Sequence, residues 1–142
     1  MIGWLLVTAQ FMVIIFLAWP TYSPVVSIYG LLLGTAGLSV GIWTFRHNQP
    51  GNFNVHPQPK RQGRLITSGP YHFIRHPMYT ALLLVSAAAV CFYDFDKTKL
   101  FAWSVLVLVL WLKTSLEERA LLKQYPEYAN YSSHTGRFLP GL

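Results

Sequence analysis

The chain has 142 residues, of which 53% are hydrophobic and only 11% are charged. Soluble domains carry about a quarter charged residues, so this composition argues against an ordinary soluble domain. The apolar residues stand in long runs without the amphipathic repeat of a soluble bundle, which places the helices in lipid. We therefore expect an all-α fold, a polytopic membrane bundle of about four transmembrane helices that forms a single domain over residues 1–142.

The formal charge is +6, from eleven Lys and Arg against five acids. A basic balance is typical of proteins that bind nucleic acid or anionic lipid, but here nearly all the cations fall in one loop and in the tail. They are Arg46, Lys60, Arg61, Arg64 and Arg75 in the loop, and Lys113, Arg119, Lys123 and Arg137 in the tail. By the positive-inside rule we expect the loop and both termini to be cytosolic, with membrane lipids and no nucleic acid as partners.

The first predicted span covers residues 2–19 and the second covers residues 25–45, joined by a tight turn. Trp4 and Trp19 stand near the two ends of the first span, as interfacial aromatic residues do. The second span carries two consecutive small-xxx-small repeats, formed by Gly30, Gly34, Gly37 and Gly41. Such repeats let helix backbones approach closely in lipid, so these glycines predict a packing seam.

Residues 46–77 are polar and rich in Pro, Gly, Asn and His. This composition does not span a bilayer, and the segment is long for a mere connection, so we expect a functional loop. The third predicted span covers residues 78–93 and the fourth covers residues 100–113. The fourth helix is expected to continue into the cytosolic tail, residues 114–142, because TSLEERALLKQY contains good helix formers and no breaker.

The densest group of polar side chains is LITSGPYHFIRHPMY, residues 65–79, directly before the third span. Pro77 suits the first position of a helix, which puts His76 at the helix mouth. The backbone donors of such a helix end favour an anion, for instance a cofactor carboxylate. Tyr71 and Tyr79 offer ring faces to a cation.

Two other interpretations of this group stay open. The residues also fit an interfacial belt, with Arg75 at a lipid phosphate and the Tyr rings at headgroup level. A metal site is a further alternative, since imidazoles are common ligands. The candidate ligands are His47, His56, His72, His76 and His134, but they show no paired ligand spacing, so no metal is expected.

Lys113 and Glu117 stand four residues apart on the fourth helix, and Glu118 follows. On a shared helix face, Glu117 could bind a cationic amino group and Lys113 an anionic substrate group. A simple helical ion pair explains the same spacing. In the tail, Arg137 precedes an apolar FLP sequence that fits an interfacial anchor.

Taken together, LITSGPYHFIRHPMY, the apolar hairpin, LEERALLKQYPEYANY and RFLPGL resemble the isoprenylcysteine carboxyl methyltransferase family and its phospholipid methyltransferase relatives. The resemblance covers residues 51–142. It implies an S-adenosylmethionine-dependent methyltransferase with a cytosolic cofactor pocket, acting on a lipophilic small molecule or lipid. The implied cofactor contacts are His56, Arg64, Leu65, Ile66, Tyr71, His76, Pro77, Met78, Tyr79 and Glu117.

Within this resemblance Glu117 would hold the amino group of the cofactor. In the loop, Gln58 is the alternative to His56 as a cofactor contact. Lys113 stands where eukaryotic members have an Arg for the substrate carboxylate, a departure that weakens any claim for a prenylcysteine acceptor. Lys113, Glu117 and Arg137 are the candidate catalytic residues.

The expected topology suits such an enzyme, because a cytosolic cofactor and a laterally entering lipophilic acceptor would meet at the membrane interface. Methyl transfer requires chiefly alignment of the reacting atoms. Two alternatives remain. One is a relative of the membrane steroid reductases that binds NADPH at a comparable place. The other is a non-enzymatic membrane partner protein that uses the glycine seam.

Overall fold

The computed structural model describes residues 2–22, 24–48 and 65–141. These residues form five α-helices and one short 3₁₀ helix, and no β-strand occurs among them. The all-α prediction is therefore confirmed. The helices are α1 (Ile2–Ala18), α2 (Ile28–His47), η1 (Gly69–His72), α3 (Pro77–Phe92), α4 (Lys97–Gln124) and α5 (Tyr128–His134).

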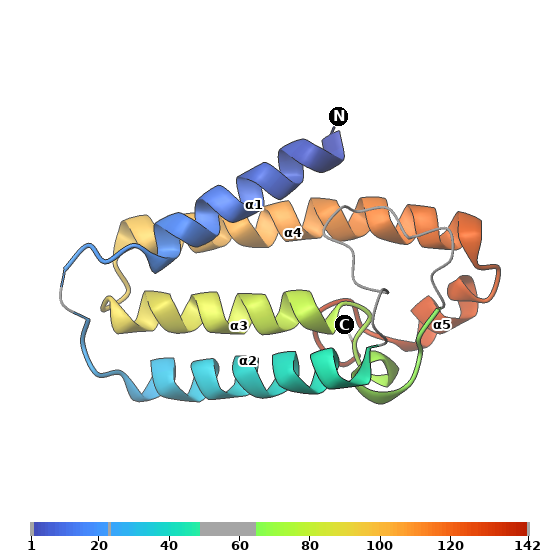
Figure 1. Cartoon of the computed structure of the whole chain (residues 1–142), viewed down its shortest axis with the longest axis horizontal. Coiled ribbons are helices and arrows are strands. Elements are labelled where there is room, and N and C mark those ends of the chain that lie inside the picture. The colour runs from blue at the N-terminus through green and yellow to red at the C-terminus, as the bar shows by residue number, and fades with distance from the viewer. Residues whose placement is uncertain (1, 23, 49–64, 142) are drawn as a thin grey trace.

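The four long helices run up and down, each antiparallel to the next (Figure 1). The end of α2, the start of α3, the polar extension of α4 and α5 all lie at the same end of the molecule. The described parts of the predicted cytosolic loop and tail therefore lie at one end of the bundle.

The helix limits differ from the predicted spans for local reasons. α2 begins at Ile28 instead of residue 25, because the Ser27 hydroxyl accepts the N–H of Gly30 at 3.2 Å as an N-cap. α4 begins at Lys97, since the Asp96 carboxylate accepts N–H groups of the first turn at 2.9 and 3.0 Å. The helix then continues without a break to Gln124, which confirms its predicted extension.

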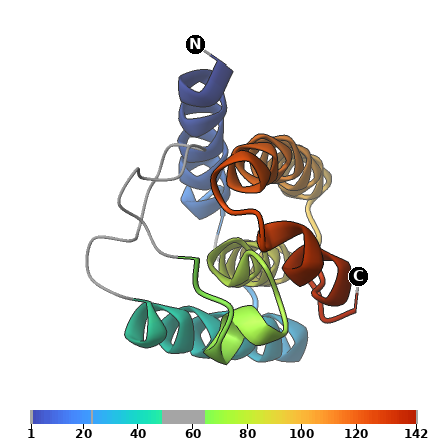
Figure 2. The same ribbon diagram turned by 90° about the vertical axis from the view of Figure 1, so that its right-hand side faces the viewer.

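The core lies between α1, α3 and α4 (Figure 2). Its buried side chains are Leu17, Val90, Ala102, Leu106 and Leu110. α2 packs closely along α3, on the side of α3 away from α4. α3 is thus the central helix of the bundle, and its first residues belong to the predicted site.

The glycines of α2 form the contact with α3, which confirms the predicted seam. A Cβ atom at Gly37 would approach Val85 Cγ2 to 2.8 Å and the backbone oxygen of Ala81 to 3.0 Å. A Cβ atom at Gly34 would meet the Cβ of Ala88 at 3.6 Å, an ordinary contact. The seam is therefore tight at Gly37 and relaxed one turn earlier.

This difference predicts opposite results for two identical substitutions. Gly37→Ala should lower the free energy of unfolding by about 1–3 kcal/mol, because α2 must move away from α3. Gly34→Ala should leave stability unchanged or raise it by up to about 1 kcal/mol, since Ala is the better helix former. Thermal unfolding of both variants in the same detergent measures the difference, and equal melting temperatures would contradict the seam.

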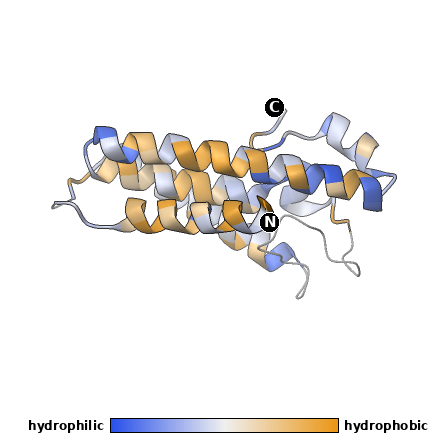
Figure 3. Ribbon diagram, turned by 90° about the horizontal axis from the view of Figure 1, so that it is seen from above, coloured by the Kyte–Doolittle hydropathy of each residue, from blue (hydrophilic) through white to orange (hydrophobic). Residues whose placement is uncertain are grey.

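Large apolar side chains cover the outside of the bundle. Leu5, Met12 and Phe101 are 66%, 67% and 72% exposed. The apolar residues occupy the middle of the helices, with hydrophilic residues toward the ends (Figure 3). α2 and α4 are each long and apolar enough to cross a membrane, and α1 and α3 are shorter apolar helices. Such an exposed apolar surface fits lipid, and the number of four spans stays a prediction.

Candidate functional site

The candidate site lies where α3 begins, beside the polar extension of α4 and the tail (Figure 1). Pro77 is the first residue of α3 and His76 is its N-cap, as the sequence predicts. The His76 ring does not cap the helix. Instead it stacks on Tyr79, with ring centroids 5.7 Å apart, and its Nε2 lies 3.1 Å from Glu118 Oε1.

The tail lies alongside the segment that precedes α3. The Arg75 N–H donates to the Gly136 carbonyl at 2.8 Å, and the His76 N–H donates to the Arg137 carbonyl at 3.1 Å. These bonds accompany a parallel bridge in which Gly136 pairs with Ile74. One N–H group at the mouth of α3 is therefore taken by the chain itself, so this helix end offers an anion fewer free donors than the sequence alone suggested.

Glu118 is the centre of a buried ionic network. Its Oε1 lies 2.8 Å from Arg75 Nε and its Oε2 lies 2.6 Å from Arg137 Nη2, while His76 Nε2 is the third partner. Burial alone would raise the pKa of the Glu118 carboxyl, but hydrogen bonds from His76, Arg75 and Arg137 outweigh it and lower the pKa to about 2. The carboxylate thus ties α4 to the start of α3 and to the tail.

Both arginines have further partners inside the protein. Arg75 Nη1 donates to the Ser132 carbonyl at 2.8 Å and to the carbonyl of Thr135. The Arg137 guanidinium lies 4.3 Å above the Trp111 ring. Arg75 therefore points inward, and the interfacial-belt interpretation does not hold for this residue.

Glu117, the neighbouring acid, is more exposed and has different contacts. Its side chain is 27% exposed, against 11% for Glu118. The Tyr79 hydroxyl donates to its Oε2 at 3.3 Å, and His76 Nδ1 lies 3.9 Å away. Burial and then the charge of Glu117 raise the pKa of Tyr71 to about 12. Two residues predicted to bind the cofactor, His76 and Tyr79, therefore lie at the carboxylate predicted to do the same.

Lys113 lies one turn before Glu117 and is only 1% exposed. Its Nζ donates to Gln10 Oε1 at 2.7 Å and lies 5.1 Å from the centroid of the Tyr79 ring. Gln10 was not among the residues predicted from the sequence. The available signal was an amide side chain inside an otherwise apolar run, since polar residues within membrane spans often mark functional positions.

The other predicted cofactor residues differ in their exposure. Leu65 and Ile66 are half-buried in the segment before η1, and Pro77 is buried. Met78 is 38% exposed and lines an apolar groove of about 440 Å³ between α2 and α3. His56 and Arg64 lie outside the described residues.

The described histidines are dispersed. His47 Nε2 lies 3.0 Å from the Ser68 hydroxyl, and His134 Nδ1 lies 2.9 Å from the Asn130 carbonyl. In residues 2–22, 24–48 and 65–141, no three His, Cys, Asp or Glu side chains are grouped to hold a metal ion.

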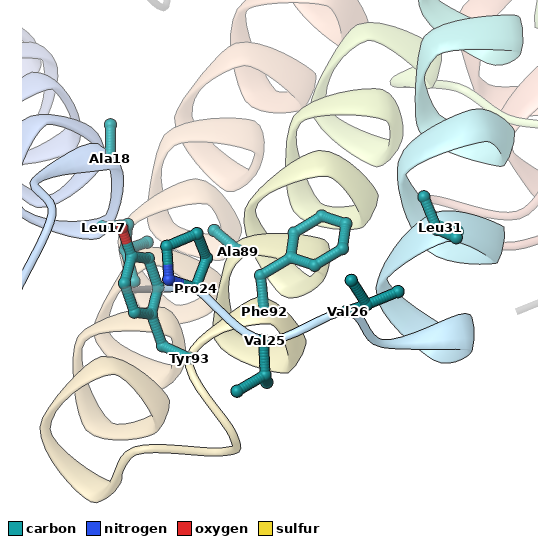
Figure 4. A pocket seen from close by; sticks show the side chains of 9 residues that line it. All are labelled: Leu17, Ala18, Pro24, Val25, Val26, Leu31, Ala89, Phe92 and Tyr93. Carbon is teal, nitrogen blue, oxygen red and sulfur yellow. The ribbon is translucent and has the colours of Figure 1, made fainter. Parts of the chain in front are cut away.

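A second groove, of about 420 Å³, lies at the opposite end of the bundle, between the end of α1, the start of α2 and the end of α3 (Figure 4). Its lining is almost entirely apolar, with Phe92 at the end of α3, Tyr93 directly after it, and Val25 and Val26 from the segment before α2. No charged side chain lines it. Among the described residues, this groove therefore offers no charged group for chemistry, in contrast to the Glu117 end.

Comparison with known proteins gives two findings. Residues 25–128 match the phospholipid methyltransferase family, a segment that holds α2, α3, α4, Lys113 and Glu117 but neither α1 nor Arg137. The chain is also 32% identical over 87 residues to the cobalt-zinc-cadmium resistance protein CzcN of Cupriavidus metallidurans. That similarity covers 58% of this chain and 38% of the relative, so the chain spans well under two thirds of CzcN.

Proposed function

The chain belongs to the phospholipid methyltransferase family, and on that premise we propose that it is an integral membrane methyltransferase. We propose S-adenosylmethionine as the methyl donor and a lipophilic molecule, lipid or isoprenoid, as the acceptor. The observation that carries this proposal is that the Tyr79 hydroxyl and the His76 ring both lie at the partly exposed carboxylate of Glu117.

The residues around Glu117 fit this cofactor chemically. Among the described residues, the nearest hydrogen-bond donor to the Glu117 carboxylate lies at 3.3 Å, which leaves capacity for an ammonium group. The electron-rich faces of Tyr71 and Tyr79 suit a sulfonium cation. Leu65 and Ile66 would add backbone contacts, and His76, Pro77 and Met78 would form the wall of the pocket. His56 and Arg64 stay predicted contacts.

The protein's part in the reaction is orientation. S-adenosylmethionine, when bound, supplies an activated methyl group. Glu117 would fix the amino end of the ligand, while Lys113 would receive an anionic group of the acceptor. Holding nucleophile, methyl and leaving sulfur in line supplies much of the rate enhancement in such a transfer. Arg137 was predicted to be catalytic, but its contacts with Glu118 and Trp111 support a role in holding the tail in place.

The proposed topology places all four long helices in the membrane. Both termini, the loop 46–77 and the tail would then face the cytosol, where S-adenosylmethionine is available. The acceptor would enter sideways from the bilayer. The gathering of the polar segments at one end of the bundle supports this arrangement.

Titration calorimetry with Glu117→Gln tests the proposal. We expect S-adenosylmethionine and its demethylated product to bind the purified wild-type protein saturably in detergent. Glu117→Gln should weaken binding by about tenfold to a hundredfold, since it removes a charge-assisted hydrogen bond to the amino group.

Glu127→Gln is the matched control, because Glu127 is an exposed acid on the same side of the molecule. It should bind the cofactor like the wild type. A folded wild-type protein that binds neither ligand would refute the proposal. Thermal stabilisation by NADPH and not by S-adenosylmethionine would support the reductase alternative instead.

A further inference from the structure

α4 buries two lysines, and they are satisfied in different ways. Lys99, near its start, donates to the carbonyls of Leu17 at 3.1 Å and Trp19 at 2.9 Å, with Phe16 O at 3.5 Å. An ammonium group has three N–H donors, so these oxygens account for all of them. Lys99 is therefore fully engaged by the end of α1.

Lys113, near the other end of the apolar part of α4, has fewer hydrogen-bond acceptors around its ammonium group. Among the described residues, its one hydrogen-bond acceptor is Gln10 Oε1, at 2.7 Å. The Tyr79 ring adds a cation-π contact at 5.1 Å. Two ammonium donors are thus left without an acceptor from the described part of the chain, although the side chain is as deeply buried as Lys99.

The partner of Lys113 is an amide, and this decides whether the positive charge is neutralised. An amide oxygen orients an ammonium group but does not neutralise it, whereas a carboxylate would do both. A buried cation is costly unless an anion compensates for it. Glu117 lies one turn away, but in the proposed function its charge is answered by the cofactor amino group. The positive charge of Lys113 then stays available to an anionic group of another ligand.

We propose that Gln10 is a positioning residue of the acceptor site, which holds Lys113 as a buried cation ready to bind an anionic group, carboxylate or phosphate, on the acceptor. This inference rests on the proposed methyltransferase function. Gln10 belongs to α1, outside the segment matched to the family. Acceptor recognition would therefore depend on a helix that the family match does not include.

The isosteric substitution Gln10→Glu separates this role from a merely structural one. The new carboxylate keeps the bond to Lys113 and adds an ion pair. If the Gln10–Lys113 pair only stabilises the bundle and Lys113 binds no ligand, the variant should have equal or higher stability with unchanged ligand binding. A positioning role predicts equal or higher stability together with loss of anion binding, because the charge of Lys113 is neutralised. Met12→Leu, an exposed position on the same helix, is the control.

The measurement is binding of three single-chain probes in neutral detergent micelles: dodecanoate, dodecyl phosphate and uncharged dodecanol. We expect wild-type protein and Met12→Leu to bind one or both anions saturably, and Gln10→Glu to bind them about tenfold more weakly. Preference for dodecanoate or for dodecyl phosphate identifies the source of the anionic group. Wild-type binding of dodecanol as tight as that of both anions, or unchanged anion binding by Gln10→Glu, would overturn the inference.

S-adenosylmethionine calorimetry on the same samples keeps the two proposals apart. Cofactor binding that Gln10→Glu retains, with anion binding lost, supports the inference. Absence of cofactor binding in the wild type would refute the proposed function, whether or not the anionic probes bind at Lys113.

Discussion

Glu118→Gln should lower the free energy of unfolding by about 3 kcal/mol or more, the cost typical of breaking a buried ion pair from one side. The substitution leaves Arg75 and Arg137 near each other without the carboxylate that both contact at 2.8 and 2.6 Å. The tail should detach from the start of α3, so the melting temperature in detergent should fall and proteolysis of the tail should become faster.

Glu117→Gln is the control for this prediction. Glu117 makes weaker contacts, with its nearest donor at 3.3 Å, and its side chain is more exposed. Its substitution should leave the melting temperature nearly unchanged while it weakens cofactor binding. A Glu118→Gln variant as stable as the wild type would show that the ionic network does not hold the tail. The structural role given to Glu118 and the cofactor-binding role given to Glu117 would then have to be exchanged.

The same carboxylate predicts a pH dependence of stability. The pKa of Glu118 falls from 4.5 to about 2 on folding, so the folded state favours the ionised form. The resulting stabilisation, up to about 3 kcal/mol, is complete above pH 4.5 and is lost as the pH falls toward 2. Thermal unfolding across this window should show that Glu118→Gln has a flatter profile than the wild type.

Lys99→Met should destabilise the protein by about 3 kcal/mol. The Lys99 ammonium donates to the carbonyl of Leu17, in the last turn of α1 where carbonyls lack a partner within the helix, and to that of Trp19, just after the helix. It also lies 4.1 Å from the centroid of the Tyr93 ring. Methionine matches the length of the stem but leaves buried carbonyls without a donor, which costs about 1–3 kcal/mol for each group.

Lys97→Met, at an exposed position two residues earlier in α4, should change stability by less than about 0.5 kcal/mol. Thermal unfolding of both variants in detergent provides the comparison. Equal and small effects would show that water or lipid can replace Lys99 at the end of α1. α1 should loosen in Lys99→Met, so amide exchange should be accelerated there more than in α2.

Much of the fold could be predicted because membrane helices carry their own signals. Long apolar runs identify α1 to α4 to within a few residues, since a bilayer accepts only segments with satisfied backbone groups. Pro77 indicates the start of α3 because its fixed φ and missing N–H suit the first helical position. The glycine spacing of α2 predicts a close helix contact, though not which helix provides the partner.

The residues of the candidate site could be predicted from the sequence, but not which of their side chains contact one another. Glu117 and Glu118 are adjacent and chemically identical, yet about 100° of helix rotation sends their side chains in different directions. Whether an acid meets two arginines or an open pocket then depends on where the tail lies. The sequence places Arg75 beside a lipid phosphate as readily as beside a carboxylate.

The sequence by itself determined the class of this protein, its apolar helices and the charge pattern that places the polar segments together, because these depend on local composition and on the demands of lipid. Only the tertiary structure decided that the tail packs beside α3, that Glu118 joins Arg75 to Arg137, and that Gln10 reaches Lys113. Each of these contacts joins residues far apart in the chain, and hydropathy patterns contain no information about which distant side chains meet.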